Sequence, residues 1–245
     1  VVIPVYNERF LVRELVQRVL AVEIPGIRDL ELVIVDDGSR DGTREILREI
    51  AAAHPESIRY IEHAKNGGKG AALRTGIAET TRDLIVFQDA DLEYDPRDYA
   101  RLVRPFLEDG ADVVYGSRFL PSERRRVLYH RHSLGNRFLT ALSNWFTDLD
   151  LTDMETCYKM FRAPLLKSIP FRSKDFAYEP EITGKIVKRE CRVFEVPISY
   201  LGRTYREGKK IGWRDGVRAH GAILKYWVVD DLYADDPWGG AILHN

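Results

Sequence analysis

The chain has 245 residues, of which 44% are hydrophobic and 31% are charged, and a chain of this size can bury a full enzyme core. Its formal net charge of -1 excludes a general nucleic-acid-binding protein, because contacts with phosphate backbones require a basic excess. The two cysteines, Cys157 and Cys191, lack metal-ligand spacing, which argues against a zinc site or a disulfide framework.

The first half of the chain alternates short apolar runs with stretches of helical periodicity. The apolar runs, which predict strands, are residues 1–5, 30–35, 58–61, 84–87 and 113–115. Helices are predicted between them: at about 10–20, at 43–53, from the loop at 66–70 through Ile77, and after Pro96. Near-continuous apolar strands joined by amphipathic helices predict an α/β fold, with a mostly parallel sheet covered by helices on both faces.

The alternation loosens after Arg118. The pattern there predicts a basic loop, an amphipathic helix at 134–146, a strand at 157–161, a helix from Glu179 and a strand at 193–200. Because no linker or repeat interrupts the chain, we expect a single domain over residues 1–245. No apolar run approaches the roughly 18 residues that cross a bilayer, so no transmembrane helix is expected.

Polar clusters follow the predicted strands directly, at Tyr6, Asp37, Asn66, Asp89 and Arg118. The carboxyl ends of parallel strands lie at one edge of a sheet, and ligands of open α/β sheets bind at that edge. The sequence therefore predicts that these clusters form one ligand-binding rim.

The sharpest of these clusters is Asp89-Ala90-Asp91, which follows a buried strand. Two carboxylates one residue apart can turn toward one hard cation, and Mg²⁺ and Mn²⁺ prefer such oxygen ligands together with substrate phosphates. Glu93 either completes this set or faces water. The alternative for the whole cluster is a pair of solvated loop acids.

Three other segments each allow two interpretations. The loop at 66–70 fits neither the Walker pattern nor the dinucleotide fingerprint, so its glycines are predicted to let backbone approach a ligand, and Lys69 is a ligand contact or only solvated. Asp37 either shapes a turn or accepts hydrogen bonds from a nucleobase or ribose. The basic loop at 202–210, with Arg203 and Lys209, either closes over a pyrophosphate or is simply exposed.

Five motifs in this order, at 2–8, 36–43, 68–70, 89–92 and 116–118, resemble those of family 2 glycosyltransferases. Within the family, the chain is similar to the branch of dolichyl-phosphate mannose synthases and polyprenyl-phosphate glucosyltransferases, from Val1 to about Tyr226. The resemblance implies a Rossmann-like GT-A fold, with 1–118 as the nucleotide-sugar half and 119–245 as the acceptor half. It also implies an inverting transfer of a hexose from a donor of the GDP-mannose or UDP-glucose type to a polyprenyl or dolichyl phosphate.

The resemblance also implies residue roles. The nucleotide-sugar contacts are Pro4, Tyr6, Glu8, Asp37, Lys69, Asp89, Ala90, Asp91, Arg203 and Lys209. The ligands of Mg²⁺ or Mn²⁺ are Asp89, Asp91 and Glu93. The acceptor phosphate meets Arg118 and Arg131, and the catalytic residues are Asp91, Arg118 and Asp153, the last as a base or a positioning group.

Two departures from the mannose synthase pattern concern the metal and the sugar. Glu93 stands where those synthases often have glutamine, and the stretch 155–161 differs from their glycine-phenylalanine pattern. The identity of the hexose is therefore not carried over. Rival interpretations are a glycosyltransferase with a soluble acceptor, a sugar nucleotidyltransferase, and a binding module without turnover.

Apolar residues recur at helical spacing within 134–146, beside the basic loop: Leu134, Phe138, Leu139, Leu142, Trp145 and Phe146. Such a stripe either lies on an anionic membrane surface or packs in the core. With the resemblance, it favours a cytoplasmic protein that contacts the inner face of the membrane peripherally.

Overall fold

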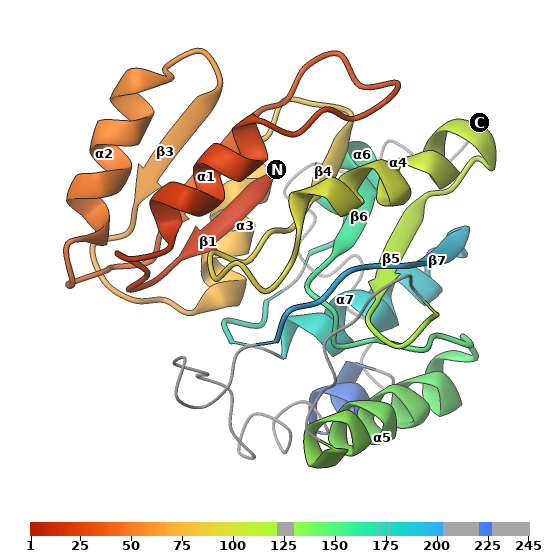
Figure 1. Ribbon diagram of the computed structural model, residues 1–245. Coiled ribbons are helices and arrows are strands. Elements are labelled where there is room, and N and C mark those ends of the chain that lie inside the picture. Colours follow the sequence, from red (N-terminus) through yellow and green to blue (C-terminus); the bar gives the residue numbers. More distant parts are fainter. Residues whose placement is uncertain (122–129, 171, 176, 203–220, 227–245) are drawn as a thin grey trace.

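The computed structural model describes residues 1–121, 130–170, 172–175, 177–202 and 221–226, and Figure 1 shows their arrangement. Its elements are, in chain order, β1 (Val2–Val5), α1 (Val12–Leu20), β2 (Leu32–Asp36), α2 (Thr43–Ala53), β3 (Ile58–Glu62), α3 (Lys69–Glu79), β4 (Leu84–Val86), η1 (Pro96–Asp98), α4 (Tyr99–Glu108), β5 (Val113–Ser117), α5 (His130–Thr147), β6 (Lys159–Arg162), α6 (Ala163–Lys167), α7 (Tyr178–Val187) and β7 (Val193–Pro197).

The strands form two sheets that join edge to edge. In the first sheet, β1, β2 and β3 pair in parallel, and the second sheet has the order β4-β6-β5-β7. A parallel bridge between Val2 and Phe87 connects the two sheets, and the Gln88 amide donates to the Val2 carbonyl at 3.0 Å. The combined order is therefore β3-β2-β1-β4-β6-β5-β7, which confirms the predicted α/β fold with a mostly parallel sheet.

Strand β6 runs antiparallel to both of its neighbours, and Met160 at its centre pairs with Val86 of β4 and Val114 of β5. The apolar pattern at 157–161 predicted a strand there but carried no information on its direction. Because β6 is reversed, the loop that precedes it reaches the edge at which β4 and β5 end. Residues 151–158 are thereby placed beside the clusters that follow the parallel strands.

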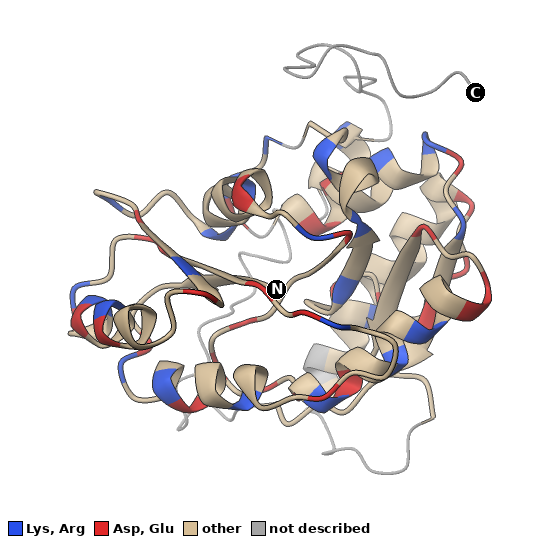
Figure 2. Ribbon diagram, turned by 90° about the horizontal axis from the view of Figure 1, so that it is seen from above, with Lys and Arg blue, Asp and Glu red and all other residues tan. Residues whose placement is uncertain are grey.

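Apolar helix faces hold this sheet. Helix α1 buries Val12, Leu15, Val16 and Val19 completely, as expected for side chains that share one face of a helix. Helix α3 packs on β1 and β2, and α4 packs on β5 and β7. Basic and acidic residues are interspersed along the ribbon (Figure 2), in keeping with the net charge near zero.

Several predicted boundaries differ from the structure. The helix expected after Pro96 begins as the 3-10 turn η1 before α4, and the strand expected at 193–200 ends at Pro197. The helix expected at 134–146 is longer in the structure, where α5 covers His130–Thr147. Across the ranges that the structure describes, none of the helices is both long and apolar enough to cross a bilayer.

The glycines at the start of α3 are required by the chain itself. Gly68 has a φ of +91°, and a Cβ there would lie 2.2 Å from the carbonyl oxygen of Lys174. The Gly70 amide donates to the same carbonyl at 2.9 Å, and a Cβ on Gly70 would lie 2.2 Å from the carbonyl oxygen of Ser173. The backbone that approaches these glycines is thus residues 173–174. These two glycines are therefore explained by packing within the chain, without the ligand that the sequence predicted at this position.

The substitution Gly68→Ala should destabilise the protein through two costs, while Gly42→Ala should incur only one. Both glycines have a positive φ, but a Cβ on Gly42 would meet nothing within 4 Å. The left-handed conformation costs alanine about 1–2 kcal/mol, and the clash at Gly68 adds roughly 1–3 kcal/mol. Urea unfolding of both variants measures this difference, and equal losses would contradict the packing of residues 173–174 against the loop.

Candidate functional site

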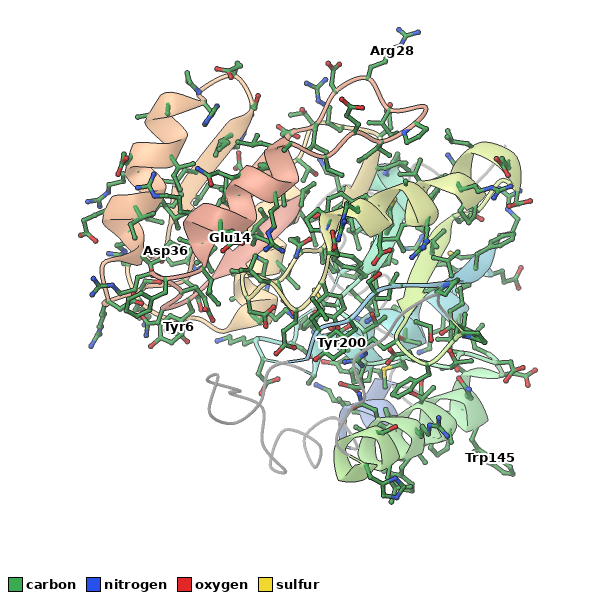
Figure 3. All side chains as sticks on the ribbon, in the orientation of Figure 1. Tyr6, Glu14, Arg28, Asp36, Trp145 and Tyr200 are labelled. Atoms are coloured by element: carbon green, nitrogen blue, oxygen red, sulfur yellow. The ribbon has the colours of Figure 1, made fainter. Side chains whose placement is uncertain are left out.

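The predicted rim is present at the carboxyl edge of the sheet. Tyr6 follows β1, Asp37 follows β2, Asp89 follows β4 and Arg118 follows β5. The strand ends point to the same side, because β1 is parallel to β2 and to the chain at Phe87, and β4 and β5 both run antiparallel to β6. In Figure 3, Tyr6 and Tyr200 lie at similar height near the middle of the view, whereas Arg28 lies at the top.

Asp37 organises the corner between β2 and α3. Its Oδ1 accepts from the Gly67 amide at 2.9 Å and lies 2.7 Å from Nδ1 of His63, and its Oδ2 accepts from the Gly68 amide at 2.8 Å. The carboxylate is almost fully buried. The turn-shaping interpretation of Asp37 is therefore observed, while Tyr6, with 42% of its surface exposed, gives this corner an accessible aromatic ring.

The other predicted nucleoside contacts lie around the same corner. Pro4 is half-buried in β1, and the Glu8 amide donates to Oγ1 of Thr43 at 3.0 Å. Ala90, between the two aspartates, is buried. Their contacts with a nucleotide stay predictions.

Lys69 is an internal ion-pair partner. Its ammonium lies 2.5 Å from Oδ1 of Asp89 and 5.5 Å from the centre of the Tyr178 ring. Burial acts to lower the pKa of Lys69, but the charge of Asp89, the neighbouring Cys157 and Glu179 and the hydrogen bond to Asp89 together outweigh it, and the pKa is raised. The alternative of a merely solvated Lys69 is wrong, because the turn into α3 directs the side chain toward the acidic motif.

Glu93 is hydrogen-bonded within the protein. Its carboxylate is largely buried and accepts a hydrogen bond from the Tyr200 hydroxyl at 2.5 Å. The left-handed Leu92, with a φ of +61°, redirects the chain between Asp91 and Glu93. Within the described ranges, no group of three histidine, cysteine, aspartate or glutamate side chains converges as metal ligands. Asp89 and Asp91 form the carboxylate pair of this motif, and the role of Glu93 as a third metal ligand stays a prediction.

This pair fits a divalent cation by the chemistry of its donors. Mg²⁺ usually takes one or two carboxylates from a protein and completes its shell with phosphate oxygens and water. Asp89 and Asp91 supply that number of carboxylates at the edge where a diphosphate can enter, whereas a site built only from protein ligands would need more.

Arg118 and Asp153 form a buried, bidentate ion pair. Nε and Nη2 of Arg118 donate to the two carboxylate oxygens, each at 2.7 Å, and the Arg118 amide adds a third bond at 3.0 Å. Burial acts to lower the pKa of Arg118, but the Asp153 charge raises it above its usual range. Arg118 therefore stays charged, and Nη1 is the guanidinium nitrogen outside this pairing.

The loop that carries Asp153 is fixed from two sides. The amides of Thr152 and Asp153 donate to the Glu195 carboxylate on β7 at 3.0 Å, and the Met154 amide donates to Oγ1 of Thr140 on α5 at 3.1 Å. The Asp153 carboxylate is thus positioned before any substrate arrives.

Two features of the site were missed from the sequence. Lys159 and Glu179 form a fully buried ion pair, and the Tyr178 hydroxyl donates to the same glutamate. Glu155 holds its Oε1 buried without a hydrogen-bond partner in the part of the chain that the structure describes. Burial, followed by the charge of Glu179, raises the pKa of Glu155 to about 7. No local signal marks these residues, because the cause is burial by elements distant in sequence.

Three predicted residues cannot be placed in this site. Arg203 and Lys209 lie outside the described residues, and Arg131 belongs to α5 but its side chain lies outside the described part.

The model of the glycosyl transferase family 2 matches residues 1–169. Polyprenol monophosphomannose synthase from Mycolicibacterium smegmatis is 28% identical over 218 residues, which cover 86% of this chain and 80% of the relative. Undecaprenyl-phosphate 4-deoxy-4-formamido-L-arabinose transferase from Edwardsiella ictaluri is 29% identical, covering 85% and 62%. Dodecaprenyl-phosphate galacturonate synthase from Rhizobium johnstonii is 27% identical, covering 94% and 64%. The chain thus spans less than two thirds of the last two relatives.

Among solved structures, glucosyl-3-phosphoglycerate synthase from Mycobacterium tuberculosis, in complex with Mn²⁺, uridine diphosphate and phosphoglyceric acid, matches with a TM-score of 0.70. The match covers 94% of this chain and 78% of that one, at 21% identity. At this identity the likeness concerns the fold, and it confirms the expected GT-A architecture.

The substitution Glu155→Gln should stabilise the protein above neutral pH. The pKa of about 7 in the folded protein lies above the ordinary value of 4.5, so the folded state binds more protons between these values and the stability from Glu155 is lost as the pH rises through 7. We expect a gain of roughly 1–3 kcal/mol at pH 8 and little change at pH 4. Thermal unfolding at both pH values measures it, and an equal shift at both would contradict the raised pKa.

Proposed function

The chain belongs to the glycosyl transferase family 2, and from this premise we propose that it transfers a sugar from a nucleotide-sugar donor to a polyprenyl phosphate. The observation that carries the proposal is the single sheet edge that holds the carboxylate pair Asp89 and Asp91 together with the fixed cation Arg118. The names of the three relatives, which each include a polyprenol or a polyprenyl-type phosphate, support the acceptor.

On the donor side, Asp89 and Asp91 would hold Mg²⁺ or Mn²⁺, and the cation would neutralise the diphosphate of the donor. Support comes from the Mycobacterium tuberculosis synthase, which has been crystallised with uridine diphosphate and either cation. Lys69 holds Asp89 at 2.5 Å and so keeps the motif in place. Tyr6 and Asp37 line the corner proposed for the nucleoside.

On the acceptor side, Arg118 would contact the lipid phosphate through Nη1, while Asp153 holds the rest of the guanidinium. A phosphate monoester has a second pKa near 6, so at neutral pH it is largely a dianion and can attack without losing a proton. An acceptor oxygen then bonds to the anomeric carbon, and the bond from that carbon to the diphosphate breaks. Because no base is required and Asp153 is fully buried, we assign Asp153 as a positioning residue.

Helix α5 carries an exposed apolar face that supports contact with a membrane. The predicted apolar stripe divides into two faces: Leu139 is buried, whereas Leu134, Phe138 and Trp145 expose 60%, 58% and 84% of their surface. With Ala141, also exposed, the three recur at i, i+4, i+7 and i+11, which places them on one face. Trp145 points away from the body of the molecule (Figure 3). We assign this outer face of α5 to peripheral contact with the cytoplasmic side of the membrane.

The substitution Asp91→Asn should lower kcat/KM by about 100-fold or more, because one carboxylate of the cation site is lost. The assay combines GDP-sugars and UDP-sugars with Mg²⁺ or Mn²⁺ and a short polyprenyl phosphate, and it detects the nucleoside diphosphate released. Asp95→Asn is the matched control, because Asp95 caps η1 and pairs with Arg97. Undiminished turnover of Asp91→Asn would refute the cation site, and release of pyrophosphate would indicate a nucleotidyltransferase.

Replacing Leu134, Phe138 and Trp145 together with serine should weaken binding to vesicles that contain anionic lipid by about 10-fold or more, because buried apolar area is lost. Co-sedimentation with vesicles measures it. The control is Leu107→Ser on α4, which removes an apolar side chain that is 57% exposed. Vesicle binding equal to that of the unaltered protein would exclude this face as the membrane contact.

A further inference from the structure

Glu155 is a site residue that the proposed transfer does not use. It lies in the loop between α5 and β6, two residues after Asp153 and two before Cys157. Its Oε1 is buried, and none of the described residues donates a hydrogen bond to it. Since an unpaired buried carboxylate oxygen is costly, its retention at this position calls for an explanation.

The cations near Glu155 are already paired with other carboxylates. Arg118 donates through two nitrogens to Asp153, and Lys159 is paired with Glu179. The charges of Glu179 and Asp153 oppose ionisation of Glu155, and those of Lys159 and Arg118 only partly offset them, so the pKa of Glu155 is raised. Since none of the described residues donates a hydrogen bond to Oε1, a bound ligand can supply the missing donor.

Along the loop before β6, Glu155 lies between residues that belong to the two halves of the site. On one side is the Arg118–Asp153 pair, assigned to the acceptor phosphate. On the other side is Cys157, whose amide donates to the Tyr94 hydroxyl at 3.1 Å and whose thiol lies against the Phe87 carbonyl, just before the acidic motif. In the proposed reaction the transferred sugar occupies this interval, because its anomeric carbon has the acceptor phosphate on one side and the departing diphosphate on the other.

We propose that Glu155 accepts a hydrogen bond from a hydroxyl group of the transferred sugar and so selects the sugar. The inference rests on the proposed function and adds a specificity-determining residue to it. A sugar that lacks this hydroxyl would leave the carboxyl group unpaired, and sites built to bind a hydroxyl group reject the analogue without it strongly. The stretch that begins at Glu155 is also where the sequence departs from the mannose synthase pattern.

The test compares transfer from the preferred nucleotide sugar with transfer from its deoxy analogues, each lacking one hydroxyl. We expect the unaltered protein to reject one analogue by about 100-fold or more in kcat/KM. In Glu155→Ala this ratio should fall toward 1 at that hydroxyl alone, and Glu155→Gln, which keeps an acceptor oxygen, should give an intermediate ratio. Glu108→Ala, which removes an exposed carboxylate paired with Arg104, is the control.

The outcomes separate the two proposals. If the unaltered protein transfers sugar and the Glu155 variants reject every analogue to the same extent as the unaltered protein, the role of Glu155 is overturned and the proposed function stands. An unaltered protein that transfers no sugar to a polyprenyl phosphate overturns the proposed function itself. Glu155→Gln preserves the size of the side chain, so it decides the matter if Glu155→Ala fails to fold.

Discussion

The direction of β6 is the constraint on which the site depends. This strand is hydrogen-bonded between β4 and β5 and runs against both, so the loop before it arrives where its neighbours end. The tie is direct, since the Phe87 amide donates to the Lys159 carbonyl and the Gly116 amide to the Tyr158 carbonyl. A parallel β6 would place Asp153 and Glu155 at the opposite edge, and Arg118 after β5 would lose the carboxylate that holds it.

Buried and half-buried ion pairs then fix the groups along this edge. Lys69–Asp89, Arg118–Asp153 and Lys159–Glu179 each join segments that lie 20 or more residues apart. Removing charges from water costs several kcal/mol, and only close pairing with further hydrogen bonds offsets it. Such pairs contribute little net stability, but they orient charge in advance of binding, which is what electrostatic catalysis requires. Glu155 lacks a pair of this kind, and stability sacrificed at a functional group is a common compromise in enzymes.

The corner proposed for the nucleoside is built by contacts of the backbone. Asp37 accepts hydrogen bonds from the amides of Gly67 and Gly68, and the carbonyls of Lys174 and Ser173 lie close to Gly68 and Gly70. The motif at 68–70 therefore packs the start of α3 against the chain, and the close packing places Lys69 where it meets Asp89. Helix α5 completes the arrangement on the same side of the sheet (Figure 1), with its outer apolar face directed away from the core.

The sequence by itself determined the alternation of strands and helices, the rim of Tyr6, Asp37, Asp89 and Arg118, and the family, because periodicity and motif order are local properties. The tertiary structure alone decided the direction of β6 and the division of α5 into a buried and an exposed face. It also decided the pairing of Lys69 with Asp89 and the hydrogen bond from Tyr200 to Glu93. Tyr200 and Glu93 are 107 residues apart. Contacts over such separations depend on which elements pack together, and neither side chain carries a local signal of its partner.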